Sequence, residues 1–354
     1  MRIGILGYPQ SGKTTLFNVL ARAHAPTGVG ASAAGGIHVG TVQVPDSRLA
    51  ALRDLFRPKK YTRARIEYVD LVGPVGKESA GALLPPQITT ADLLLVVVRA
   101  FENPAVPHPK GSVDPMRDLR EFEDELLLKD LAVLESRVAR VRKTAQVGVK
   151  EAKEELPLLE KCMAALEGSE ALRDLTFSPE EDRRLRGYQL LTPKPLLVVF
   201  NVGEAQVHGA GLAGDLPAEP HTAALEICGT VEMELVDLPE AEAREFMGVL
   251  GIHESGLDRV IRTSYELLGL CSFFTVGEDE VRAWPIIDGT PAVRAAGKIH
   301  SDLERGFIRA EVVSCGDLLA AGGLTEAKKR NQLRLEGKEY VVRDGDVMNI
   351  RFSV

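Results

Sequence analysis

The segment that most constrains the fold begins six residues into the chain. Residues 7–14 read Gly-Tyr-Pro-Gln-Ser-Gly-Lys-Thr, directly after the apolar residues 3–6. The spacing matches G-x-x-x-x-G-K-[ST], and an apolar strand before it and a helical pattern after it are the context that this motif requires. In such a loop successive backbone N–H groups form a concavity for anions, and the next helix points the positive end of its dipole at it. The segment therefore predicts a phosphate-binding loop in preference to an ordinary glycine-rich turn.

The side chains of this loop have separate expected roles. Lys13 adds a positive charge to the phosphate site, and Thr14 supplies the hydroxyl that such loops give to Mg²⁺. The nucleotide contacts that we expect from the loop and the start of its helix are those of Pro9, Gln10, Ser11, Gly12, Lys13, Thr14 and Thr15.

A second signal stands at the end of an alternating strand, residues 64–73, which closes with D-x-x-G. At the carboxyl end of a strand, Asp70 can hold a Mg²⁺-bound water, and the N–H of Gly73 can meet a γ-phosphate. Between the two signals, residues 27–36 are small and rich in glycine. We expect a switch loop there that a triphosphate orders, with a passive linker as the alternative.

Two apolar β-rich runs, residues 92–98 and 193–201, suit parallel strands that are covered on both faces. The second run ends in Asn201-Val-Gly-Glu, an approximation to the base-reading motif N-K-x-D, and a short strand over 224–230 ends where a last base-contacting loop belongs. The expected base contacts are those of Asn201, Val202, Glu204, Cys228, Gly229 and Thr230. This order of features is that of a doubly wound α/β nucleotidase.

An apolar heptad seam interrupts this pattern in two arms. Its members are Leu127, Leu131, Leu134, Val138 and Val141, followed by Val149, Ala152, Leu156, Leu159, Met163 and Leu166. Residues 146–148, Gln-Val-Gly, separate the arms and predict an antiparallel helical hairpin. The basic residues near its tip are Arg137, Arg140, Arg142, Lys143, Lys150 and Lys153. A tip that contacts RNA or ribosome phosphates and an ordinary solvated helix face are both open.

The remaining chain adds helices and a small β domain. Residues 46–56 predict an amphipathic helix that Asp46 caps, and two more amphipathic helices are expected within 237–270. Residues 271–354 contain short alternating runs and many glycines, which predict a small mixed β domain.

Composition excludes several classes of protein. The four cysteines, Cys162, Cys228, Cys271 and Cys315, are scattered without metal-ligand spacing, so neither structural zinc nor a disulfide framework is expected. The sequence contains no apolar run of about eighteen residues, and the net charge of −8 disfavours a protein that coats nucleic acid through its overall field. We expect a cytoplasmic protein that does not span a membrane.

These residues resemble the YchF subfamily of Obg-like P-loop NTPases along nearly the whole chain. The most specific runs are residues 274–284, 295–311 and 336–346, which match the family's TGS domain, a ubiquitin-like β-grasp module. The resemblance implies three parts. They are a doubly wound P-loop NTPase domain (residues 1–116 and 187–270), an inserted antiparallel coiled-coil hairpin (residues 117–186) and a C-terminal TGS domain (residues 271–354).

The sequence departs from its family at the site. Family members usually carry N-x-x-E where GTPases have N-K-x-D, and Glu204 fits that pattern, so both ATP and GTP are open as ligands. Gln10 and Ser11 replace Asn and Val, and the loss of an Asn that serves a K⁺ site argues against a K⁺ requirement. Ala34 stands where the family has a switch Thr, with Ser32 as the nearest hydroxyl, and residues 74–77 also differ.

The resemblance implies a slow, Mg²⁺-dependent nucleotidase that acts as a switch in translation or stress. In this reading Lys13 and Gly73 serve catalysis, Thr14 and Asp70 serve the metal, and the hairpin tip and TGS domain contact ribosome or RNA. The alternative is a nucleotide-binding scaffold with little or no hydrolysis, which the departures at Gln10, Ser11, Ala34 and Pro74 favour. A metabolic kinase is a weaker third reading, because D-x-x-G, the base motif and the tail would each need a separate explanation.

Overall fold

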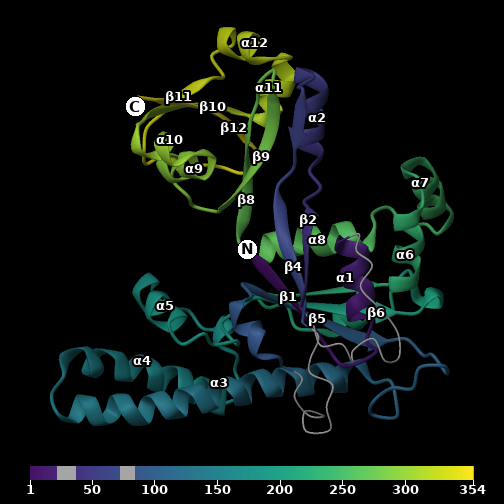
Figure 1. Cartoon of the computed structure of the whole chain (residues 1–354), viewed down its shortest axis with the longest axis vertical. Coiled ribbons are helices and arrows are strands. Elements are labelled where there is room, and N and C mark those ends of the chain that lie inside the picture. Colours follow the sequence, from purple (N-terminus) through teal and green to yellow (C-terminus); the bar gives the residue numbers. More distant parts are fainter. Residues whose placement is uncertain (22–36, 72–83, 354) are drawn as a thin grey trace. The chain divides into compact units, whose positions relative to one another are not determined.

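The computed structural model describes residues 1–21, 37–71 and 84–353 (Figure 1). The chain forms two compact units, and neither is continuous in sequence. The first comprises Met1–Thr41 and Glu67–Val260, and the second comprises Val42–Ile66 and Ile261–Val354.

A six-stranded sheet forms the centre of the first unit, in the order β2-β4-β1-β5-β6-β7. Its strands are β1 (Arg2–Leu6), β2 (Ile37–Gln43), β4 (Arg65–Leu71), β5 (Leu93–Ala100), β6 (Leu196–Val202) and β7 (Thr222–Ile227). β1 runs parallel to β4 and β5, and β6 runs parallel to β5 and β7. The carboxyl ends of these parallel strands therefore meet at one edge, which is where ligands bind in open α/β sheets.

Both faces of this sheet are covered. Every residue of β5 and β6 is buried, and Phe122 and Leu126 of α3 pack in one cluster with Val96 and Val98 of β5. Because alternate residues of a strand point to opposite faces, the burial of the intervening residues shows that the other face is also covered. The predicted doubly wound α/β fold is confirmed.

The helices of the first unit follow the strands. They are α1 (Lys13–Ala21), α3 (Pro115–Gln146), α4 (Lys150–Glu167), α5 (Pro179–Arg186), α6 (Gly229–Asp237), α7 (Glu240–Val249) and α8 (Gly256–Leu267), the last of which runs into the second unit. Short 3₁₀ turns lie at η2 (Pro86–Thr90), η3 (Leu172–Asp174), η4 (Glu204–Gln206) and η5 (Leu212–Asp215). Buried Glu232 of α6 accepts hydrogen bonds from the N–H groups of Gly256 (2.7 Å) and Leu257 (3.3 Å), and so satisfies the first turn of α8.

The predicted hairpin is formed by α3 and α4, which lie side by side (Figure 1). Leu134, Val138 and Val141 of α3 are buried, as are Leu159, Cys162 and Leu166 of α4. The seam of the second arm differs in part from the prediction. Val149 precedes α4 and is 40% exposed. Leu156 and Met163 are only partly buried, whereas Cys162 is buried. The buried residues of α4 follow the heptad positions of Ala152, Leu159 and Leu166, with Cys162 rather than Met163 between the last two.

A buried carboxylate fixes the base of the hairpin. Asp130 of α3 is 1% exposed and accepts hydrogen bonds from the backbone N–H of Leu191 (2.9 Å) and of Thr192 (2.7 Å), and from the Thr192 hydroxyl (2.7 Å). These residues lie just before β6, so the bonds join the hairpin to the central sheet.

The second unit is built on a mixed sheet in the order β11-β10-β12-β8-β9-β3. Its strands are β3 (Lys60–Thr62), β8 (Leu270–Thr275), β9 (Glu280–Ile287), β10 (Phe307–Ser314), β11 (Arg334–Glu336) and β12 (Asp346–Phe352). Its helices are α2 (Ser47–Phe56), α9 (Ala292–Ile299), α10 (Ser301–Arg305), α11 (Cys315–Ala321) and α12 (Leu324–Lys329). The predicted mixed β domain is present, with Phe273, Ala310 and Val342 fully buried in its core.

Residues 42–66 belong to the second unit, whereas the predicted domain boundaries placed them in the nucleotide-binding domain. β3 pairs parallel to β9, so that Lys60 lies opposite Glu280. Arg48, at the start of α2, pairs with Asp344 (2.6 Å) and lies over the ring of Phe274. Pairing between segments so far apart leaves no periodicity in the sequence, which is why the local pattern of residues 46–56 predicted the helix but not its partner.

Two further expectations concern composition. The four cysteines are buried and free. Among the described helices, none combines the length and the hydrophobicity that a transmembrane span requires.

Candidate nucleotide-binding site

The phosphate loop connects β1 to α1, as the motif predicts. Gly7 and Gly12 have φ values of +140° and +98°, which side chains rarely tolerate. A Cβ on Gly7 would lie 2.2 Å from the carbonyl oxygen of Val97, and one on Gly12 would lie 2.2 Å from Nδ2 of Asn201. Both motif glycines are therefore required by close approach as well as by backbone conformation.

Lys13 is held over this loop. Its Nζ donates hydrogen bonds to the carbonyl oxygens of Gly7 (2.7 Å) and Tyr8 (2.8 Å). Burial lowers the pKa of Lys13 to about 8, and the nearby negative charge of Asp70 opposes this shift. The ammonium group thus stands at the loop with its charge poorly solvated, which favours an anionic ligand.

Thr14 and Asp70 meet at the predicted metal position. Thr14 Oγ1 lies 2.9 Å from Asp70 Oδ2, and the Asp70 side chain is fully buried. Its other oxygen, Oδ1, has no hydrogen-bond partner among the described residues. A buried carboxylate that is only half satisfied, beside a hydroxyl, fits a hard cation such as Mg²⁺, which prefers oxygen ligands.

His38, which no sequence motif indicated, also faces this carboxylate. Its Nδ1 lies 3.7 Å from Asp70 Oδ2. His38 is on β2, which neighbours β4 in the sheet. The juxtaposition depends on the register of two strands, and no short motif signals it.

The predicted base-contacting residues take different positions. Asn201 is buried, donates from Nδ2 to the carbonyl oxygen of Ser11 (3.0 Å) and accepts from the N–H of Gly229 (3.0 Å). It therefore joins the phosphate loop to the start of α6. Glu204 is exposed at the start of η4, whereas Val202 is buried in β6.

The other predicted contacts lie around these two loops. Cys228 Sγ is 3.1 Å from Thr230 Oγ1 where β7 leads into α6. Pro9 is exposed, Gln10, Thr14 and Thr15 are half-buried, and Ser11 is buried with no hydrogen-bond partner for its Oγ within the part of the chain that the structure describes. Gly73, Ser32, Ala34 and residues 74–77 lie outside the described residues.

A polar cluster that the sequence did not predict surrounds Tyr8 of the loop. The Tyr8 hydroxyl donates to Glu121 of α3 (2.6 Å), Lys110 pairs with the same carboxylate, and burial together with Glu121 raises the pKa of Tyr8 to about 12. The ring of His108 lies edge-on to Tyr8, and its Nε2 is 2.9 Å from Asp118. The phosphate loop is thereby connected to the first helix of the hairpin.

The hairpin tip is less basic than its sequence suggests. Arg137 pairs with Glu155 (2.9 Å), Arg142 with Glu160 (2.7 Å) and Lys150 with Glu154 (3.8 Å). The other three cations, Arg140, Lys143 and Lys153, are exposed and form no ion pair with any described residue. Half of the predicted cluster therefore presents an uncompensated positive charge.

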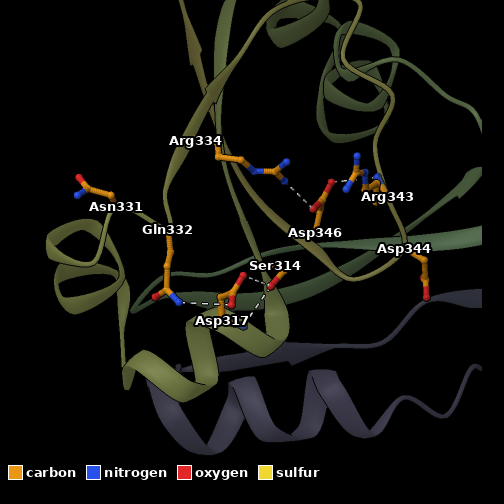
Figure 2. Close-up of a pocket in the computed structure, with 8 residues that line it drawn as sticks. All are labelled: Ser314, Asp317, Asn331, Gln332, Arg334, Arg343, Asp344 and Asp346. Atoms are coloured by element: carbon orange, nitrogen blue, oxygen red, sulfur yellow. Dashed lines mark hydrogen bonds and ion pairs between the residues drawn. The ribbon is translucent and has the colours of Figure 1, made fainter.

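The second unit contains a pocket of about 410 Å³. Figure 2 shows that several of its polar side chains contact one another. Arg334 lies 3.6 Å from Asp346, and Asp317 accepts hydrogen bonds from Ser314 (2.6 Å) and Gln332 (3.3 Å). The fold itself satisfies most of this polar lining, so the phosphate loop is the stronger candidate site.

Comparison with known proteins agrees with this geometry. Residues 2–135 match the family model described as "50S ribosome-binding GTPase", and residues 270–353 match the YchF-type C-terminal model, described as "Protein of unknown function (DUF933)". The chain is 41% identical over 361 residues to the "Ribosome-binding ATPase YchF" of Bacillus subtilis (strain 168), which covers 99% of both proteins. It is 39% identical over 360 residues to the protein of the same name in Escherichia coli O157:H7, with 100% of this chain and 99% of that protein covered.

A solved structure gives the same result for the fold. The Schizosaccharomyces pombe YchF GTPase superposes with a TM-score of 0.86 at 29% identity, over 99% of this chain and 97% of that one. From relatives of this identity along its whole length, together with the matching fold, the chain belongs to the YchF family of P-loop NTPases.

Proposed function

We propose that this protein binds a purine nucleoside triphosphate, ATP or GTP, with Mg²⁺ at the phosphate loop and hydrolyses it slowly to the diphosphate. The observation that carries the proposal is the convergence of Lys13, Thr14 and the half-satisfied carboxylate of Asp70 at the carboxyl edge of the sheet. The names of the relatives, which include both "ATPase" and "GTPase", support a nucleoside triphosphate without deciding the base.

The proposed roles follow from charge. Lys13 would neutralise charge on the β- and γ-phosphates, and Thr14 and Asp70 would hold Mg²⁺, Asp70 through water. Bound Mg²⁺ supplies charge neutralisation of the phosphate oxygens. Gly73 is proposed to sense the γ-phosphate on the strength of the D-x-x-G spacing alone. Because phosphoryl transfer depends mainly on positioning and electrostatics, weak orienting groups slow hydrolysis without abolishing nucleotide binding.

The base is proposed to bind between the loops that follow β6 and β7. Exposed Glu204 is free to accept hydrogen bonds from a base edge, and Asn201 holds the two loops and the phosphate loop together. A Glu in place of the Asp of N-K-x-D weakens selection for guanine, because the side chain is one methylene longer. Asn201 is therefore a positioning residue in this proposal.

The ribosome is the proposed partner, since the bacterial relatives are named ribosome-binding. Arg140, Lys143 and Lys153 at the hairpin tip are suited to phosphate contacts because they are exposed and uncompensated within the described chain. The C-terminal unit, proposed as a TGS domain, is the second candidate contact. The switch would then report the nucleotide state to translation.

Phosphate release tests the proposal. The protein is incubated with Mg²⁺ and ATP or GTP, with and without K⁺ and ribosomes, beside a Thr14→Ala variant. We expect slow release that ribosomes stimulate and that the variant loses. Retained nucleotide binding with no release under any condition would instead support the scaffold, the alternative that the residues at the loop and switch favour.

A further inference from the structure

We propose that His38 is a nitrogen donor to the divalent cation of the nucleotide site, so that this protein prefers a first-row cation of the Mn²⁺ class to Mg²⁺. The inference rests on the proposed function, because the cation is expected to arrive with the phosphates of the nucleotide. With His38 added, the ligands that the protein offers to the cation are a mixture of nitrogen and oxygen, instead of oxygen alone.

Packing fixes the position of His38. Its strand, β2, approaches α1 closely at Gly40, where a Cβ would lie 2.3 Å from the Cβ of Ala21 and 3.2 Å from Cε2 of Phe17. The imidazole lies against the ring of Phe17, with centroids 5.9 Å apart and planes inclined by 32°. The side chain is thus held against the helix that begins with Lys13 and Thr14.

The donor atoms converge on one carboxylate. Oδ2 of Asp70 lies 2.9 Å from Thr14 Oγ1 and 3.7 Å from His38 Nδ1. The 3.7 Å separation is too long for a hydrogen bond. Both Nδ1 of His38 and Oδ1 of Asp70 are buried without a hydrogen-bond partner among the residues that the structure describes. A nitrogen and an oxygen, each lacking a partner, therefore flank the position where the Thr14 hydroxyl meets Asp70.

The chemistry of these donors selects the cation. Mg²⁺ strongly prefers oxygen ligands and keeps much of its water. Imidazole is a softer ligand that suits first-row transition metals, and Mn²⁺ accepts carboxylate, phosphate and imidazole together. A purely electrostatic contact between a charged His38 and Asp70 is the competing explanation, and it predicts no bond from the imidazole nitrogen to any metal.

Pulsed electron paramagnetic resonance of the protein with Mn²⁺ and ADP separates these explanations. Mn²⁺ is its own probe, since ³¹P couplings report bound phosphate and ¹⁴N modulation reports a directly bound nitrogen. Protein made with ¹⁵N-histidine distinguishes an imidazole from nitrogens of the base or of lysine. We expect ³¹P coupling in every sample. The unlabelled protein should also show ¹⁴N modulation, and protein made with ¹⁵N-histidine should show a ¹⁵N signal in its place.

Two variants locate the nitrogen. His38→Asn is expected to keep the ³¹P coupling, lose the histidine modulation, and bind Mn²⁺ about tenfold more weakly with little change for Mg²⁺. His108→Asn is the matched control, because His108 belongs to the same unit, is buried and pairs with Asp118 instead, and it should keep the modulation. If His38→Asn fails to fold, isotope replacement in the unmodified protein still tests whether any histidine nitrogen binds the cation, and its absence would overturn the proposal.

The outcomes distinguish this inference from the proposed function. Phosphorus coupling without any histidine nitrogen would overturn the role of His38 and leave nucleotide binding intact. Absence of nucleotide-dependent Mn²⁺ binding would overturn both. A histidine modulation that persists in His38→Asn would also contradict the assignment.

Discussion

The phosphate loop and the hairpin tip are both polar regions that the sequence marks as ligand sites, yet the fold satisfies their polar groups to different degrees. Near the loop, the Ser11 hydroxyl and one oxygen of Asp70 are buried with no hydrogen-bond partner in the described chain. At the tip, Arg137 and Arg142 pair with acids of the opposite arm of the hairpin. A polar motif is therefore the stronger candidate for a ligand site where the fold leaves its buried groups without partners.

The same contrast appears between two buried carboxylates. Asp130 is fully satisfied by backbone and hydroxyl donors of Leu191 and Thr192. Asp70 receives one hydrogen bond, from Thr14, within the described residues. The first arrangement stabilises the fold, and the second costs stability until a cation binds.

Removal of the loop cation should have the largest effect. Lys13→Ala is expected to weaken nucleotide binding at least 100-fold, about 3 kcal/mol, because charge-assisted hydrogen bonds to phosphate are lost. Calorimetry measures the affinity. Lys59→Ala, which removes a highly exposed lysine that pairs with Asp279, is the control and should bind normally. Unchanged affinity in Lys13→Ala would break the assignment of the site.

Asp130→Ala should destabilise the fold by about 2–3 kcal/mol, because buried donors lose their acceptor. Chemical denaturation measures the free energy of unfolding. The nucleotide affinity of the folded variant should change little. A stability equal to that of the unmodified protein would mean that these bonds do not anchor the hairpin.

Asp70→Asn should act in the opposite direction. Without nucleotide, the variant is expected to be as stable as the unmodified protein or more stable by about 1 kcal/mol, because a poorly satisfied buried charge is removed. Its nucleotide affinity should lose most of its dependence on Mg²⁺. Denaturation curves with and without Mg²⁺ and nucleotide measure both effects, and a large loss of stability in the ligand-free variant would contradict the comparison of the two carboxylates.

The smallest effect is expected at the hairpin tip. Replacing Arg140, Lys143 and Lys153 by Ala should weaken ribosome binding and lower its salt dependence, by a slope of about 0.7–0.9 for each phosphate that the variant no longer neutralises. The matched control replaces Arg137, Arg142 and Lys150, whose charges are already compensated. Equal effects of the two triple variants in sedimentation assays would show that ion pairing at the tip does not matter.

Local pattern and motif spacing predicted much of this structure. The run of residues 3–14 gave β1 and the phosphate loop, and the heptad seam predicted both arms of the hairpin, because these features depend on neighbours in sequence. D-x-x-G placed Asp70 at the end of β4 for the same reason.

Other features depend on contacts between distant segments. The pairing of β3 with β9, the contact between His38 and Asp70, and the bond from Tyr8 to Glu121 leave no local signal. For Asn201 the motif predicts a nucleotide contact, whereas the contacts that depend on distant segments place its side chain between Ser11 and Gly229.

A calorimetric titration of the unmodified protein with ATP, GTP, ADP and GDP, in Mg²⁺ and again after chelation, tests the assignment of the nucleotide site most directly. We expect at least one purine triphosphate to bind at a single site, with an affinity that chelation weakens. No binding of any of the four nucleotides in the presence of Mg²⁺ would contradict this assignment.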